Sequence, residues 1–324
     1  MKSAVVLQAG QMPVYADFQE PAPAAGENRI IVAAAAISPV VRSRAAGTHY
    51  SASNQFPFVA GIDGVGRLDD GRRVYFAMPR APFGSMAERT VAPSALCVTV
   101  PDDLDDVTAA AIANPGMSSW AAYKQRARLK AGETVLVNGA TGTAGRLAVQ
   151  IAKHLGAGKV IATGRNVESL RAVEALGADV TIPLVEDDNV LEESFKAQFA
   201  VGVDVVIDYL WGRSAERLLI AGAKAGADAA PIRFVQIGSV SGADITLPSA
   251  VLRASAIALM GSGIGSIRLD GLAQSIGELL QATVSVGLEI STRAVPLSDV
   301  EEAWAGGNGI GRTVLTIGRR EAAD

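Results

Sequence analysis

The spacing of hydrophobic positions changes along the chain, and the change predicts two kinds of structure. From residue 1 to about 120, short apolar runs such as 29–32, 74–76 and 95–100 are separated by turn residues. This pattern predicts a mostly β region. Between about 121 and 264, apolar runs alternate with helical patterns, which is typical of βαβ units that form a parallel sheet.

Six apolar runs in the middle of the chain are candidate strands of that sheet. These runs are residues 134–137, 159–162, 180–182, 203–207, 233–237 and 256–260. With helices between them, six such strands fit one doubly wound sheet. After residue 264, a helical stretch near 272–281 is followed by strand-rich sequence that contains a short helix near 298–304. We therefore expect the end of the chain to return to the first region.

Chain length supports this division, because 324 residues exceed what one hydrophobic core usually supports. We expect a discontinuous, mostly β domain formed by residues 1–120 and 265–324. Residues 121–264 are expected to form a Rossmann domain that binds a dinucleotide. The predicted fold class is therefore α/β, with a doubly wound parallel sheet beside a mostly β domain.

Composition and charge indicate which classes of partner the protein is not expected to bind. Hydrophobic residues make up 49% of the chain and charged residues 19%, and the net charge is −4 without a basic run. We expect a globular protein that binds neither nucleic acid nor membranes. The apolar stretch after Met1 is too short for a signal peptide, and no apolar segment is long enough to span a bilayer. Cys97 is the sole cysteine, so no internal disulfide forms and a cytoplasmic location is the expectation.

A glycine-rich turn follows the strand expected at 134–137. The glycines at 139, 142 and 145 give a GxxGxxG spacing, which departs from the commoner GxGxxG fingerprint. Missing side chains let the backbone approach a diphosphate, and the positive end of the next helix favours an anion. The alternative is a turn with close helix packing, but the βαβ context favours a dinucleotide site. The expected contact residues are Gly139, Thr141, Gly142, Thr143, Ala144 and Gly145.

The end of the second strand indicates which dinucleotide binds. An NAD-preferring site would carry an acidic residue there to bind the ribose hydroxyls. The sequence has Gly164, Arg165 and Asn166 instead. The Arg165 guanidinium is suited to a 2′-phosphate, with Asn166 as a neutral donor beside it. The sequence therefore predicts NADPH, although Arg165 could also be a surface residue at a strand end.

These motifs, together with 176–179 before the third strand, 203–208 for the fourth and Ile237-Gly238-Ser239 after the fifth, resemble the medium-chain dehydrogenase/reductase superfamily. Within it the chain resembles the zinc-independent quinone oxidoreductase branch, over essentially its whole length. The resemblance implies a GroES-like β domain packed against the Rossmann domain, with the active site in the cleft. It also implies a homodimer that pairs the sixth strand, and it adds Ile237, Gly238 and Ser239 to the cofactor site.

Zinc-dependent members of the superfamily use two cysteines and a histidine as catalytic ligands. By the resemblance these positions hold Ser38, Ile62 and Pro115 here. Cys97 and the two histidines of the chain cannot assemble a tetrahedral Cys/His site. We therefore expect no metal. Hydride transfer then suits an acceptor that stabilises the added electrons itself, such as a quinone or an α,β-unsaturated carbonyl compound.

Catalytic and further cofactor residues are suggested by two segments. Tyr50 is the candidate donor to the developing oxyanion, because related reductases often have a tyrosine just after a glycine; it could equally cover the cleft as an apolar ring. Asn114 and Ser118 resemble residues that line the cofactor cleft. The alternative is that Ser118 or Ser119 caps a helix over 121–128.

The favoured function is an NADPH-dependent, zinc-independent reductase that transfers hydride to a small-molecule quinone or enone. One alternative is a zinc-free, alcohol dehydrogenase-like oxidoreductase that acts on another carbonyl group. A second is a non-catalytic NADPH-binding redox sensor. Relatives that bind RNA are disfavoured, because the sequence has no basic stripe.

Overall fold

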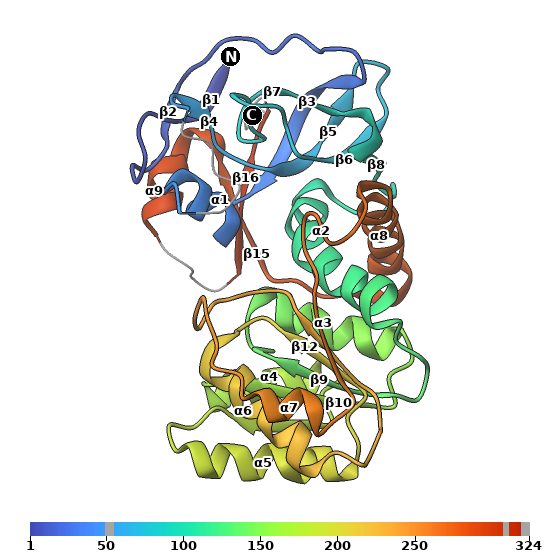
Figure 1. Ribbon diagram of the computed structural model, residues 1–324. Coiled ribbons are helices and arrows are strands. Elements are labelled where there is room, and N and C mark those ends of the chain that lie inside the picture. The colour runs from blue at the N-terminus through green and yellow to red at the C-terminus, as the bar shows by residue number, and fades with distance from the viewer. Residues whose placement is uncertain (49–54, 307–310, 319–324) are drawn as a thin grey trace. The chain divides into compact units, whose positions relative to one another are not determined.

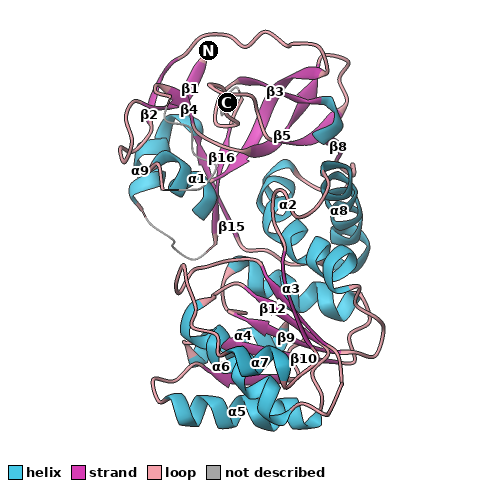
Figure 2. Ribbon diagram, viewed as in Figure 1, coloured by secondary structure: helices cyan, strands magenta, loops and turns pink. Residues whose placement is uncertain are grey.

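A computed structural model describes residues 1–48, 55–306 and 311–318. The chain forms two compact units. Unit 1 contains Met1–Asn114 and Ala273–Asp324, and unit 2 contains Pro115–Leu272. The domain limits expected from the sequence, near 120 and 264, stay a prediction. Figure 2 shows strands predominating in unit 1, whereas strands and helices alternate in unit 2.

Unit 1 is built on two sheets. Its strands are β1 (Lys2–Val6), β2 (Val14–Asp17), β3 (Glu27–Ala36), β4 (Phe58–Val59), β5 (Asp63–Leu68), β6 (Arg73–Ala77), β7 (Arg89–Pro93), β8 (Cys97–Thr99), β15 (Thr292–Pro296) and β16 (Arg312–Thr316). The smaller sheet has the order β2-β1-β4. The larger has the order β15-β16-β3-β5-β6-β8, and β7 also pairs with β3. Because β16 pairs antiparallel with β3, the end of the chain belongs to this unit.

The core of unit 1 lies between the sheets and two short helices. These helices are α1 (Pro39–Ala45) and α9 (Val300–Ala305), and 3₁₀ turns form at Ser94–Leu96 and Leu297–Asp299. Ile30, Phe76 and Leu315 are fully buried there, and Trp304 of α9 packs with them. Apolar residues at alternate positions of the strands supply this core, as expected when one face of a strand is buried.

Unit 2 contains one six-stranded parallel sheet in the order β11-β10-β9-β12-β13-β14. Its strands are β9 (Thr134–Asn138), β10 (Lys159–Gly164), β11 (Val180–Pro183), β12 (Val205–Asp208), β13 (Ile232–Gln236) and β14 (Ile257–Gly261). Its connecting helices are α3 (Thr143–His154), α4 (Val167–Ala175), α5 (Asp188–Val201), α6 (Gly212–Ala225) and α7 (Ser249–Arg253). This strand order is that of the Rossmann fold. The predicted fold class is confirmed.

Both faces of the parallel sheet are covered, because right-handed crossovers extend the sheet in one direction after β9 and in the opposite direction after β12. Helices α3 and α4 pack on strands β9, β10 and β11. Helices α5 and α6 pack against each other, as can be followed in Figure 1. Leu136, Phe195, Leu218 and Phe234 are buried together between that helix pair and the sheet.

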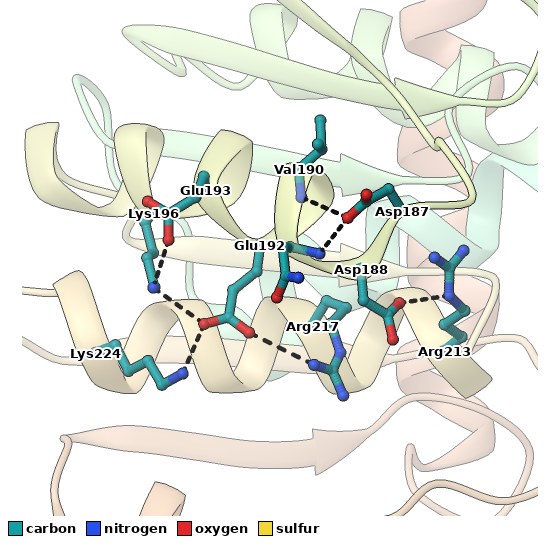
Figure 3. Close-up of polar contacts among 10 residues, drawn as sticks. Asp187, Asp188, Val190, Glu192, Glu193, Lys196, Arg213, Arg217 and Lys224 are labelled. Atoms are coloured by element: carbon teal, nitrogen blue, oxygen red, sulfur yellow. Dashed lines mark hydrogen bonds and ion pairs between the residues drawn. The ribbon is translucent and has the colours of Figure 1, made fainter.

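A buried carboxylate ties α5 to α6. Glu192 accepts hydrogen bonds from Lys224 at 2.7 Å and from Arg217 at 3.5 Å, and it pairs with Lys196 at 3.1 Å. Figure 3 shows these three cations converging on the one carboxylate. The Lys224 hydrogen bond is the main cause that lowers the pKa of Glu192.

Two longer helices run across the limits between the units. They are α2 (Asp106–Ala121) and α8 (Leu269–Ala282), and π-helical turns follow them at Ala122–Ala127 and Thr283–Gly287. The alternative that Ser118 or Ser119 caps a helix is wrong, because α2 begins at Asp106 and includes Pro115. The Ser118 and Ser119 hydroxyls donate to carbonyl oxygens three residues earlier. Within the described residues, no helix combines the length and apolarity that a bilayer crossing requires.

Candidate functional site

The glycine-rich turn lies at the carboxyl edge of the parallel sheet, between β9 and α3. Strands β10 and β12 flank β9, and the crossovers that follow β9 and β12 extend the sheet in opposite directions. This is the switch point at which open α/β sheets bind ligands. Unit 2 therefore positions the turn where a dinucleotide site is expected.

The three glycines of the turn differ in what surrounds the position that a side chain would occupy. A Cβ atom at Gly145 would lie 2.3 Å from the Gly139 carbonyl oxygen, so α3 packs directly on the turn. Gly139 has a φ of +89° and lies against Leu210. A Cβ at Gly142 would meet nothing closer than 3.9 Å, and its φ of −77° suits any residue. Close packing and backbone conformation within the protein explain why glycine is needed at 139 and 145. At Gly142 the space beside the backbone is open, and nothing within the protein requires glycine there.

Unpaired backbone donors face this open position. Gly142 is the N-cap of α3 and supplies no side-chain cap. The backbone N–H groups of Thr143, Ala144 and Gly145 have no acceptor among the described residues. The first N–H groups of a helix, with the positive end of its dipole, bind anions. The turn therefore fits the diphosphate of a dinucleotide.

A buried polar network holds the turn from below. Asn138 Nδ2 donates to Asp208 Oδ1 at 2.8 Å and to Ser214 Oγ at 2.9 Å. Thr163 Oγ1 donates to Asn138 Oδ1 at 2.7 Å and accepts from the Gly139 N–H at 3.0 Å. Burial raises the pKa of Asp208. No sequence motif predicts this network, although Asn138 and Asp208 each end an apolar strand.

The two residues expected to select the cofactor lie next to the turn. The Thr163 carbonyl oxygen of β10 accepts the Ala140 N–H at 2.8 Å, and Thr141 packs on Gly164 closely enough that a Cβ at 164 would lie 2.4 Å from its methyl carbon. Arg165 follows directly. It is exposed and makes no hydrogen bond or ion pair with the described residues.

Asn166 has a structural role in addition to the expected one. Its side-chain oxygen accepts the Ser169 N–H at 2.8 Å and caps α4. The amide nitrogen of Asn166 is not used by this cap, so it is still available as a donor to a ligand.

Residues after β13 meet the same edge of the sheet. The backbone N–H groups of Ile237 and Gly238 donate to the Asp208 carbonyl oxygen at 2.8 and 3.2 Å. A Cβ at Gly238 would lie 2.7 Å from the Tyr209 carbonyl oxygen, so glycine allows this close approach. Ser239 is exposed beside them. These three predicted residues therefore lie beside the carboxyl end of β12.

Ser118 also reaches the end of β12. Its hydroxyl donates to the Pro115 carbonyl oxygen at 2.6 Å and lies 3.4 Å from the Tyr209 hydroxyl. Burial raises the pKa of Tyr209 to about 12, so this hydroxyl stays protonated and can donate. Asn114 lies one turn earlier in α2 and is half-buried.

Unit 1 contains Ser38 and Ile62, two of the three positions at which the resemblance would place zinc ligands. Ser38 is buried and caps α1 by accepting the Val41 N–H at 3.1 Å. Ile62 is an aliphatic residue just before β5. Across residues 1–48, 55–306 and 311–318, no group of three or more His, Cys, Asp or Glu side chains is arranged to hold a metal ion. Tyr50, the predicted oxyanion donor, lies outside the described residues.

Sequence comparisons identify relatives. The family model described as "Zinc-binding dehydrogenase" matches residues 144–281. A probable NADPH-dependent quinone reductase of Emericella nidulans is 29% identical, and the alignment covers 94% of this chain and 96% of the relative. The quinone oxidoreductase of Lama guanicoe is 31% identical over 61% of this chain and 62% of its own length.

Solved structures extend the comparison to the whole chain. The quinone oxidoreductase of Thermus thermophilus, solved alone and with NADPH, superposes with a TM-score of 0.81 at 26% identity and covers 98% of this chain and 100% of its own. A mycobacterial quinone oxidoreductase gives a TM-score of 0.84 at 23% identity and covers 98% of this chain and 99% of its own; at that identity it supports the fold alone. These relatives and solved structures support the resemblance of the chain to the medium-chain dehydrogenase/reductase superfamily, in its quinone oxidoreductase-like branch.

Proposed function

We propose that this protein is an NADPH-dependent, zinc-independent reductase of quinones or α,β-unsaturated carbonyl compounds. The proposal agrees with the names of its relatives. These include a probable NADPH-dependent quinone reductase and an NADPH-dependent alkenal/one oxidoreductase of Arabidopsis thaliana that is 31% identical over 49% of this chain.

One observation carries the proposal. At Gly142 three unpaired backbone donors face open space, and the unpaired guanidinium of Arg165 follows the adjacent strand. The donors suit a diphosphate and the guanidinium suits a 2′-phosphate, which NADPH carries and NADH lacks. When bound, NADPH supplies a hydride.

The chain's own residues bind and orient the reactants. The turn and Arg165 hold the phosphates, and the network under Asn138 fixes the turn before the cofactor arrives. Ser38, Ile62 and Pro115 offer no metal-ligand set. The acceptor must therefore stabilise the added electrons within its own conjugated system. We propose Tyr50 as the donor to the oxyanion that develops on the acceptor.

Assembly and location are also part of the proposal. β14 is an edge strand of its sheet, and its Ala258 and Leu259 side chains are exposed. An unpaired edge with exposed apolar residues is suited to pairing with a second copy, which supports a homodimer. A cytoplasmic location is proposed from the single cysteine, Cys97.

Steady-state turnover tests the proposed activity. Purified protein is supplied with NADPH and, separately, 1,4-naphthoquinone, 9,10-phenanthrenequinone, a short enone and a simple ketone, while NADPH absorbance is followed. We expect oxidation with the quinones or the enone, and none with the ketone. Activity with the ketone alone would identify a carbonyl oxidoreductase instead. Tight NADPH binding without any turnover would favour a redox sensor.

Metal analysis of the same sample tests zinc independence. We expect less than stoichiometric zinc and full activity after treatment with a chelator. Stoichiometric zinc whose removal abolishes activity would contradict the proposed chemistry.

A further inference from the structure

Unit 1 contains a pocket with a mostly apolar wall. α1, the segment from β4 to the start of β5, and the loop at 79–83 surround it. Its described lining includes Val41, Arg44, Phe58, Ile62, Pro79 and Phe83. Arg44 is the one charged residue among the described residues that line the pocket. The pocket therefore combines aromatic and aliphatic surface with a single positive charge.

Arg44 differs from Arg42, which lies on the same helix. The Arg42 guanidinium donates to the Trp304 carbonyl oxygen at 2.8 Å and lies 4.9 Å from the centre of the Trp304 ring. Arg44 is half-buried and makes no hydrogen bond or ion pair with the described residues. Desolvation lowers the pKa of Arg44, although a guanidinium remains charged at neutral pH.

A partly desolvated cation without a counter-ion is costly unless a ligand provides one. The planar guanidinium matches a carboxylate with two parallel hydrogen bonds. Phe58, Phe83 and Ile62 offer the apolar contacts that an aromatic ring requires. This combination fits an organic molecule with a flat apolar body and one anionic group.

We propose that Arg44 binds a carboxylate on the acceptor, so that the enzyme prefers aromatic enones or quinones that carry an acidic group. This inference rests on the proposed function, because it names the substrate class of the same reductase. The aromatic and aliphatic lining of the pocket suits the flat conjugated ring of a quinone or an aromatic enone, which is why we assign the pocket to the acceptor. Arg44 then determines specificity and takes no part in the chemical step.

Equilibrium binding tests the pocket without relying on turnover. Calorimetry compares 1-naphthoate with the neutral 1-naphthamide, neither of which is an enone or a quinone. For Arg44→Gln we expect the affinity for 1-naphthoate to fall about tenfold or more, while that for 1-naphthamide changes less than about twofold. Arg44→Lys keeps the charge but loses the planar fork, so we expect an intermediate affinity. Arg67→Gln removes an exposed arginine of β5 and is the matched control.

Turnover then connects the pocket to the reaction. With 3-benzoylacrylate, hydride from NADPH adds to one alkene carbon and a proton from solvent to the other, which gives the saturated ketone and NADP⁺. We expect Arg44→Gln to lower kcat/KM for this acid about tenfold relative to its methyl ester, mainly through KM. Thermal unfolding of each variant checks that folding is unchanged.

The two experiments separate the possible failures. Arg44-dependent binding of 1-naphthoate without turnover of any quinone or enone would leave the anion site standing and contradict the reductase. Quinone turnover with equal losses for the acid and ester, and no Arg44-dependent binding, would leave the reductase standing and overturn this inference. No binding of 1-naphthoate to the wild-type protein would also overturn it.

Discussion

Buried polar groups are paired differently at the carboxyl edge of the unit 2 sheet and in the core of unit 1. At the carboxyl edge of the unit 2 sheet, Asn138, Thr163, Asp208 and Ser214 satisfy one another through a continuous set of hydrogen bonds. In unit 1, the Tyr75 hydroxyl donates to Asp63 Oδ2 at 2.7 Å. Several other buried polar atoms of unit 1 have no partner among the described residues: Asp63 Oδ1, Ser85 Oγ, Thr90 Oγ1, and Arg312 Nε and Nη2.

The difference indicates how each unit serves binding. A satisfied network is rigid, so the turn above it presents fixed donors to a cofactor at little entropic cost. Buried charged groups with atoms that lack hydrogen-bond partners instead cost stability, and their titration makes stability depend on pH. We therefore expect some substitutions in unit 2 to change the affinity for the cofactor without changing the free energy of unfolding, and others to do the reverse. In unit 1 we expect the free energy of unfolding to depend on pH.

Gly145→Ala should have the largest effect on stability. The added methyl group would overlap the Gly139 carbonyl oxygen and the Ala140 Cα atom, and backbone cannot move aside as a flexible side chain can. We expect a loss of about 4 kcal/mol in the free energy of unfolding, measured by denaturant titration. Gly142→Ala is the matched control: stability changes by less than about 0.5 kcal/mol, but NADPH affinity falls about tenfold because the methyl group occupies the diphosphate position. Equal effects at both glycines would contradict the different roles assigned to them.

Asp63 tests the pH dependence of unit 1. Desolvation raises its pKa from 3.8 to about 6, although Arg312 and the Tyr75 hydrogen bond oppose the shift. The folded protein then keeps a proton at pH values where the unfolded chain has lost it. The contribution of Asp63 to stability is therefore greatest below about pH 4 and falls as the pH rises to about 6.

The shift corresponds to about 3 kcal/mol. Asp63→Asn cannot lose this proton, so we expect the variant to gain about 3 kcal/mol relative to the wild-type protein between pH 4 and pH 7. Denaturant titrations of both proteins across that range measure the difference between their free energies of unfolding. The contributions of the other titrating groups are the same in both proteins and cancel in this difference. A stability difference that stays constant with pH would show that Asp63 is not titrating as the buried environment requires.

Glu192 tests how much paired charge stabilises unit 2. Glu192→Gln leaves Lys196, Arg217 and Lys224 close together without their carboxylate, and we expect a loss of about 2 kcal/mol at pH 7. Because the folded-state pKa of Glu192 is lowered, this contribution is present above its ordinary value of 4.5 and disappears as the pH falls through the lowered pKa.

Asp188 offers a control on the same helix. It pairs with Arg213 at 2.6 Å, but both side chains are about half exposed, and Figure 3 shows this pair beside the Glu192 cluster. Asp188→Asn should cost less than about 0.5 kcal/mol in denaturant titrations. If Glu192→Gln lowered the free energy of unfolding by no more than Asp188→Asn does, burial would not strengthen the contribution of the Glu192 ion pairs to stability.

Local patterns predicted unit 2 well. Its six strands lie within one or two residues of the expected runs, because buried parallel strands are continuous apolar segments bounded by turn residues. The glycine turn, Arg165 and residues 237–239 all follow such strands, so the parallel arrangement brings them to one edge. The start of the helix over 121–128 was placed wrongly, because Asn114-Pro115-Gly116 has the composition of a chain break, whereas α2 already begins at Asp106. Burial of Pro115 and Gly116 shows that packing outweighs this local preference.

The pocket in unit 1 could not be predicted in the same way. Arg44, Phe58 and Phe83 come from three separate segments, and no periodic pattern relates them. The network under the turn was missed for a similar reason, because Thr163 and Ser214 become partners of Asn138 only when β10 and α6 have packed. Sequence indicates which residues end a strand, whereas the pairing of side chains depends on the tertiary structure.

The proposed function requires that the turn at 139–145 and Arg165 bind the phosphates of NADPH. Calorimetric titration of NADPH and NADH into the wild-type protein and Arg165→Gln tests it most directly. We predict that the wild-type protein binds NADPH more tightly than NADH, and that the substitution weakens NADPH binding about tenfold while NADH binding is unchanged. Equal losses for both nucleotides, or no binding of either to the wild-type protein, would contradict the account.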